Sequence, residues 1–374
     1  MGSLSQQYFL NSNGNGEIIM HYLKKWQWFA ILTLIFLSPP NSLAVEWKGS
    51  DWNVNLNGAL RVSYNDDDIG TETAAKTSNK YLSGNKSHVQ LTGSRALTMG
   101  INGIFKTEWG LDPTDNGEGA EKLSLYDMDQ YLGLEGSFGL LRVGTMLTPY
   151  MQTGTMMDPY RRDALGARFF PKIQSALHTG TDKGRGRTTN SLRYDSPTTH
   201  GAGAQFFYGI DQSDENNNSF GTGLTFDSEY FSLFAQWYDN GEPGKDEAYK
   251  FGGELKGGGA ALFGQYEFDD GLISIAENLS GNDLTTETNS TDGADTWHLG
   301  LKYTNGKFLI IGQYGQRKNS KNGAMSDDGL TGWLLGLSVY LDKTFYLYTG
   351  YTQRDYNNDR DNDSRFCLGG TLTF

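Results

Sequence analysis

Charged side chains that alternate with apolar ones are the residues of this 374-residue chain that could do chemistry. One such segment begins at Trp52. One of its faces carries Asn53, Asn55 and Arg61, and valines and leucines form the other face. A second alternation, near residue 105, turns the charged pair to the polar face. Its apolar members are Met99, Ile101, Phe105 and Trp109, and its polar members are Lys106 and Glu108. Such faces can attract or orient ions along a wet surface, or they can serve only to keep that surface hydrated.

Patterns typical of enzymes and metal sites do not occur in the sequence. The histidines at 88, 178, 200 and 298 lack metal-ligand spacing, and no serine occupies a nucleophile elbow. The acidic run 359–363 resembles the start of a calcium loop but lacks its glycine and distal glutamate. We interpret it as a solvated loop tip, with a loosely held divalent ion as the alternative. We expect no catalytic residue, no cofactor and no structural metal, and the single Cys367 excludes an internal disulfide.

Sixteen alternating segments of about ten residues could position the charges, and each is long enough to cross a bilayer as a tilted strand. They are about 52–65, 85–94, 97–111, 125–136, 139–147, 187–196, 201–211, 219–227, 230–240, 247–256, 259–269, 294–304, 307–317, 330–341, 344–354 and 365–374. Short turns, such as Arg95-Ala96 and Asn305-Gly306, alternate with long polar loops, such as Asp66 to Gly84. This alternation is typical of outer-membrane barrels, and a soluble β-sandwich is the less favoured alternative.

The C-terminal segment supports a closed barrel. Phe366, Leu368, Gly370, Leu372 and Phe374 share one apolar face of the final strand. An open edge with such a face would be prone to aggregation, whereas a barrel pairs its last strand with its first.

The N-terminal residues have the pattern of a secretory signal peptide. Lys24-Lys25 precede the apolar run 29–37, which is followed by Pro39-Pro40 and the small-residue site Ser42-Leu43-Ala44. The run is too short to span a bilayer as a helix, which disfavours a membrane anchor. We therefore expect residues 1–44 to be an extension and signal peptide, starting at Met1 or Met20, and residues 45–374 to form one barrel domain.

The net charge of the chain argues against nucleic acid as a partner. It is −13 overall, and residues 1–44 carry two lysines and one glutamate, so residues 45–374 carry −14.

Three stretches resemble the Gram-negative general porins. Residues 131–139 (YLGLEGSFG) resemble the family's Y-x-G-L-x-G-x-F-G hairpin, and residues 141–150 resemble the strand that leads into an inward-folded third loop. Residues 187–197 (RTTNSLRYDSP) resemble its R-x-x-N-S-x-R-Y-x-S-P strand. The resemblance implies an all-β, sixteen-stranded antiparallel transmembrane barrel that assembles as a homotrimer. It also implies a third loop that narrows a passive, water-filled pore.

The resemblance further implies a constriction in which wall arginines face acidic residues of the third loop. His88 stands where the first of those arginines is expected and Met128 where the second is expected, and Arg187 is retained. The expected third loop, 148–186, carries Asp158 and Asp163, but its basic residues outnumber its acids. Because two wall arginines are replaced, we expect a weak preference for cations. We expect some loop arginines to tie the loop to the wall.

The predicted function is passive diffusion of small hydrophilic solutes and ions across the outer membrane of a Gram-negative bacterium. The alternatives are a solute-specific channel and, less favoured, an outer-membrane barrel enzyme. The predicted pore-lining residues are Arg61, His88, Lys106, Glu108, Asp158, Asp163 and Arg187. The resemblance implies that Phe374 is an assembly signal for the barrel-insertion machinery. Outer-membrane lipid and lipopolysaccharide are further expected partners.

Overall fold

The structure is a computed structural model of the whole chain, and it describes most of the residues after position 43. The described residues are 44–70, 77–114, 126–174, 186–210, 218–239, 241, 247–270, 293–319, 321, 327, 329–357 and 361–374. The predicted signal peptide and residues 359–360 of the acidic run lie outside them. Within these ranges, no helix is long and apolar enough to cross a membrane.

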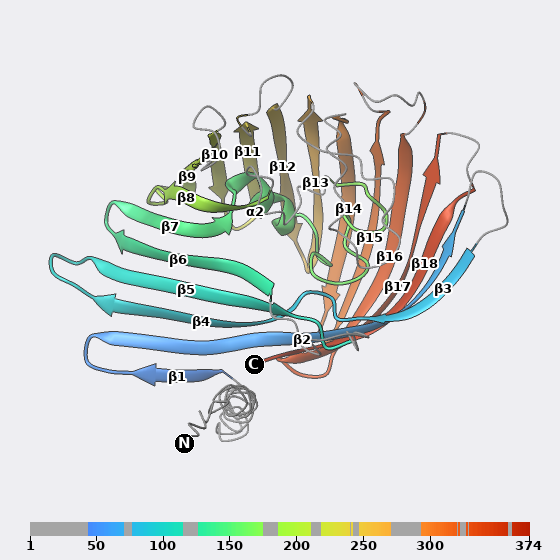
Figure 1. Cartoon of the computed structure of the whole chain (residues 1–374). Coiled ribbons are helices and arrows are strands. Elements are labelled where there is room, and N and C mark those ends of the chain that lie inside the picture. Colours follow the sequence, from blue (N-terminus) through green and yellow to red (C-terminus); the bar gives the residue numbers. More distant parts are fainter. Residues whose placement is uncertain are drawn as a thin grey trace, which may run out of the picture.

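The described strands form a closed antiparallel barrel (Figure 1). The strands are β1 Val45–Lys48, β2 Trp52–Ile69, β3 Thr77–Ser83, β4 Ser87–Ala96, β5 Asn102–Leu111, β6 Tyr126–Gly136, β7 Gly139–Leu147, β8 Arg187–Asp195, β9 Ala202–Gly209, β10 Ser219–Asp227, β11 Phe231–Asp239, β12 Glu247–Gly257, β13 Ala260–Asp269, β14 Thr296–Asn305, β15 Phe308–Arg317, β16 Leu330–Tyr340, β17 Phe345–Tyr356 and β18 Asp363–Thr373. The one described helix, α2, spans Pro149–Met156. Apart from the pairings of β2, each strand pairs with its neighbours in sequence, so the sheet is an up-and-down meander.

The barrel closes along strand β2. One edge of β2 pairs with β1 over Asn53–Leu56 and with β18 over Ala59–Asp68. Its other edge pairs with β4 and then with β3. The short strands β1 and β3 therefore share two positions with β18 and β4, and the barrel has sixteen strand positions in all, as predicted from the sequence.

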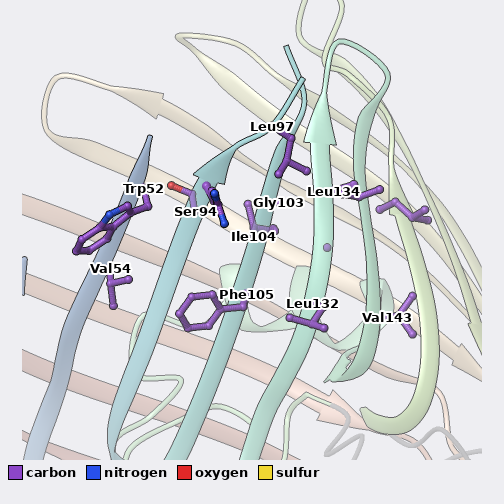
Figure 2. Close-up of a pocket in the computed structure, with 13 residues that line it drawn as sticks. Trp52, Val54, Ser94, Leu97, Gly103, Ile104, Phe105, Leu132, Leu134 and Val143 are labelled. Atoms are coloured by element: carbon purple, nitrogen blue, oxygen red, sulfur yellow. The ribbon is translucent and has the colours of Figure 1, made fainter. Parts of the chain in front are cut away.

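The two faces of the sheet differ as the alternation predicts. Leu60, Val62 and Leu368 are among the exposed large apolar residues, whereas Arg61 and Glu108 are buried on the inner side. A predominantly apolar hollow lies on the outer wall of β2 and β4–β7, where Phe105 and Leu132 project between smaller side chains (Figure 2). Such a wall suits contact with lipid or with an apolar protein surface rather than with water.

The third loop lies inside the barrel. It begins at Thr148, whose side chain caps α2 by accepting a hydrogen bond from the N–H of Met151. Helix α2 packs against β9, β10 and β11, and the chain then runs along the inner wall (Figure 1). Tyr150, Met151 and Met146 share a buried cluster with Phe207 and Tyr238. Met151 and Met157 therefore pack the loop against the wall, whereas Met156 is 57% exposed.

Two sequence-based boundaries were wrong. The turn expected at Arg95-Ala96 lies after Ala96, because β4 continues to that residue and β5 begins at Asn102. Met99 is therefore in the turn, 94% exposed at a positive φ of 61°, and does not belong to the apolar face of a strand. The connection expected from Asp66 to Gly84 is also shorter than predicted, because β2 and β3 extend into it.

The line along which β18 pairs with β2 and closes the barrel, called the seam below, leads to a prediction about Phe374. Its backbone exchanges two hydrogen bonds with Gly58, of 2.7 and 3.0 Å, and its ring lies where a side chain at position 58 would project. Deleting Phe374 removes these contacts at the last pair of the closing strands. We expect a clear loss of heat-resistant assembled protein on electrophoresis and its accumulation unassembled, while Phe374→Tyr retains assembly. A normal yield of heat-resistant protein from the deletion variant would contradict this expectation.

Candidate pore constriction

The third loop reaches the opposite wall of the barrel through Arg162. Its guanidinium donates to Glu108 on β5 at 3.3 Å and lies 2.9 Å from Nδ1 of His88 on β4. Glu108 is fully buried and His88 is 7% exposed. A charge-assisted contact from loop to wall therefore crosses the lumen at this level.

On the wall, three further ion pairs continue from Glu108. Lys106 lies 2.7 Å from Glu108 and 3.1 Å from Asp129 on β6. Arg187, at the start of β8, donates to the other oxygen of Asp129 at 2.8 Å. Strands β5, β6 and β8 thus carry charges of alternating sign on the inner face.

The acidic residues of the loop point away from this wall. Asp163 is 4% exposed and lies 3.9 Å from Arg61 on β2, while Tyr346 donates a hydrogen bond of 3.2 Å to it. Asp158 is 1% exposed and accepts hydrogen bonds from the N–H groups of Tyr160 and Ala167. Asp158 therefore shapes the loop, and Asp163 holds it to the wall near the seam.

Two wall arginines hold the far end of the loop. Arg354 on β17 donates to the carbonyl oxygen of Phe170 at 3.0 Å, and Arg365 on β18 donates to that of Ala164 at 3.0 Å. Both guanidinium groups also lie over the ring of Phe170, at 4.8 and 4.4 Å. Each is neutralised by a carboxylate, Asp363 and Asp67 respectively. The loop is thereby docked against the C-terminal strands.

A cavity of about 280 Å³ remains between the loop and the wall formed by β5–β8 and the turn before β4. The charged side chains that line it are Lys86, Lys106, Asp129, Arg142, Arg161, Arg162, Arg168, Arg187 and Arg193. Met128, at the position of an expected arginine, also lines it. Positive charge on the inner wall thus comes from arginines and lysines at other positions, although His88 and Met128 replace two expected arginines.

The structure brings most of the predicted pore-lining residues into one network. Its members are Arg61, His88, Lys106, Glu108, Asp163 and Arg187. Only Arg187 and Lys106 line the cavity directly, and Asp158 lies within the loop. Of the loop arginines expected to bind the wall, Arg162 does so, whereas Arg168 donates within the loop to Met151 and Arg161.

Three wall residues escaped the sequence-based reasoning. Asp129 joins two cations, and Arg142 and Arg193 face each other across β7 and β8 and both bind Asp195. The exposed Leu132 and Leu134 set an alternation that turns Asp129 inward, so this signal was present in the sequence. The inward position of Met128 follows instead from the shifted register between β5 and β6.

Burial shifts the acidity of both loop carboxyl groups. It raises the pKa of Asp158 to about 6 and that of Asp163 to about 7, although nearby arginines oppose the shift. Both groups therefore lose negative charge as the pH falls from 8 to 5.

The barrel with its inward loop defines the class, and comparison with known proteins defines the family. A sequence model of the Gram-negative porins matches residues 32–359, and the chain belongs to that family. Membership places it among the channels of the outer membrane. A curated relative, the chitoporin of Vibrio furnissii, is 27% identical over 195 residues, which are 50% of this chain. The chain spans about half the length of that relative, with 48% covered.

Solved porin structures share the fold. An anion-selective porin from Comamonas acidovorans is 18% identical, with a TM-score of 0.68 over 87% of this chain and 100% of its own. OmpF of Salmonella typhi in complex with daunomycin is 15% identical, with a TM-score of 0.65 over 88% and 100%. The trimer form of OmpT from Vibrio cholerae is 14% identical, with a TM-score of 0.60 over 87% and 100%.

The docking contacts predict the effect of removing Arg365. Its pair with Asp67 is largely buried, and breaking a buried ion pair by removing one partner costs about 3–5 kcal/mol. We expect Arg365→Gln to loosen the loop end at Ala164, giving more frequent transient closures in single-channel recordings and a lower denaturation temperature. Lys343→Gln, which removes an exposed positive charge from the turn between β16 and β17, should leave both unchanged. If the variant closes no more often than the wild type and denatures at the same temperature, Arg365 does not hold the loop.

The acidity of the loop predicts a pH dependence of ion selectivity. Protonation of Asp163 leaves Arg61 without its counter-charge, so the lumen becomes more positive as pH falls through about 7. We expect the reversal potential in a salt gradient to move towards anions between pH 8 and pH 5. Asp163→Asn should already show this shift at pH 8, and its reversal potential should no longer change around pH 7, where Asp163 titrates in the wild type. A flat profile in the wild type, or a shift towards cations, would refute this account.

Proposed function

We propose that the chain forms a water-filled channel through which small hydrophilic solutes and ions diffuse passively. The single observation that carries the proposal is the docked third loop, which crosses the lumen at Arg162 and leaves a charged cavity beside the wall. Family membership and the porin fold support it. The passage would run between the loop and strands β4–β8, with Lys106 and Arg187 at its border and Arg61, His88, Glu108, Asp158 and Asp163 supporting it.

Assembly as a homotrimer is part of the proposal, supported by the trimer form of a structural neighbour. The apolar outer wall of β2 and β4–β7 would contact lipid, lipopolysaccharide or another subunit (Figure 2). Phe374 would act in assembly through the barrel-insertion machinery. Membership of the porin family and the apolar outer surface of the barrel support these assignments.

A solute-specific channel is the second candidate, favoured by the relationship to a protein named chitoporin. The two candidates differ in how transport depends on concentration. A diffusion pore gives a flux proportional to solute concentration and falling with solute size, whereas a specific channel binds its solute and saturates.

The test is uptake by liposomes that contain the purified protein. We expect rates for neutral sugars to rise linearly with concentration and to fall steeply from monosaccharide to trisaccharide. A chitin-derived oligosaccharide should not block the single-channel current. Saturable block by that oligosaccharide would instead support the specific channel, and no uptake of any sugar would contradict the diffusion pore. Liposomes without protein and the barrel with Lys343→Gln serve as controls.

A further inference from the structure

The cavity between the third loop and the wall is basic on both sides. The loop contributes Arg161, Arg162 and Arg168, and the wall side contributes Lys86, Lys106, Arg142, Arg187 and Arg193. Asp129 is the acidic residue in the described lining. A solute in this space would therefore meet positive charge from opposite directions.

The nearby carboxylates neutralise only part of this charge. Glu108, Asp129 and Asp195 serve the five cations that form ion pairs at the wall. Those cations are Lys106, Arg142, Arg162, Arg187 and Arg193. The remaining three, Lys86, Arg161 and Arg168, form no ion pair with any residue that the structure describes.

Arg168 is the most buried of these three, at 5% exposure. One terminal nitrogen donates to Sδ of Met151 at 3.0 Å and the other to the carbonyl oxygen of Arg161 at 3.2 Å. Its Nε has no acceptor in the described part of the chain. A guanidinium group stays charged at all relevant pH values, so this donor points to an external acceptor.

The loop's own acids compensate for only part of this excess, because Asp158 attracts Arg161 and Arg168 but is engaged within the loop. Asp163 is bound near the seam by Arg61 and Tyr346, and both oxygens of Asp158 accept backbone N–H groups of the loop. Neither residue lines the cavity.

We propose that this cavity is a binding site for small oxyanions, namely solutes that carry phosphate or carboxylate groups. Planar guanidinium forks match the oxygens of both groups and donate charge-assisted hydrogen bonds to them. The site lies in the passage of the proposed channel, and the inference rests on that proposed function. A bound oxyanion would dwell there and reduce the current carried by chloride, so transport of such solutes saturates while that of neutral sugars does not.

The experiment is single-channel recording in dilute potassium chloride, where charges are weakly screened, with inorganic phosphate or succinate added. We expect reversal potentials that favour chloride over potassium and a saturable block by added oxyanion. Block by phosphate alone, by succinate alone or by both identifies which oxygen-bearing group the site accepts.

Two variants test the assignment. Arg161→Gln changes an exposed side chain without an ion pair to any described residue, and Arg168→Gln changes the buried one. We expect each to weaken the block roughly fivefold and to move the reversal potential towards cations. Lys343→Gln, in the exposed turn between β16 and β17, is the charge-matched control and should change neither. If Arg168→Gln fails to assemble, the block measured in Arg161→Gln alone decides whether the oxyanion binds in this cavity.

The outcomes separate the two proposals. A wild-type protein without conductance would contradict the channel itself. A conducting channel that prefers potassium, or one that neither oxyanion blocks in a saturable manner, would overturn the binding site and leave the channel intact. Block that is unaltered in both arginine variants would also overturn the assignment to this cavity.

Discussion

Docking of the third loop against the C-terminal strands is the interaction on which the rest of the pore depends. Ordering a loop costs about 1–2 kcal/mol of backbone conformational entropy per residue, so residues 148–174 stay inside only if the wall offers many contacts. Arg354 and Arg365 supply them by donating to loop carbonyls and enclosing Phe170, and Tyr160 lies 3.2 Å from the Ser338 hydroxyl. Because the loop occupies this side, the free space and its positive charge lie on the other, beside β5–β8.

Local alternation along the sequence was enough to predict the barrel and most strand ends. It works because each strand has one apolar face and pairs with its neighbour in sequence, so little long-range information is needed. The seam was missed in detail because β1 and β3 are short strands that share the edges of β2 with longer partners, a relation that local patterns do not encode. The turn after β4 was misplaced because its apolar Leu97 and Met99 look like strand residues.

The candidate site was predictable in part. Arg61, Lys106 and Glu108 face inward because of the alternation, and Arg187 was placed by the resemblance to porins. The distribution of charge on the loop could not be derived, since it depends on which groups bind Asp158 and Asp163. The sequence suggested a depleted wall and a weak preference for cations. The folded chain gathers basic residues from four wall elements and the loop around one cavity, and this arrangement supports the proposal that the pore attracts anions.

A cross-link between the loop and the wall tests the docked position most directly. The Cβ atoms of His298 on β14 and of Ile173 in the loop both lie 2.8 Å from the point where a Cβ atom of Gly315 would stand, so cysteines at positions 298 and 173 can be joined by a disulfide or by a short bifunctional thiol reagent. With His298→Cys and Ile173→Cys in a Cys367→Ser background, we expect the cross-link to form and conductance and selectivity to stay at wild-type values. Thiols that fail to join, or a conductance that changes strongly on joining and recovers on reduction, would show that the loop rests elsewhere in the open pore.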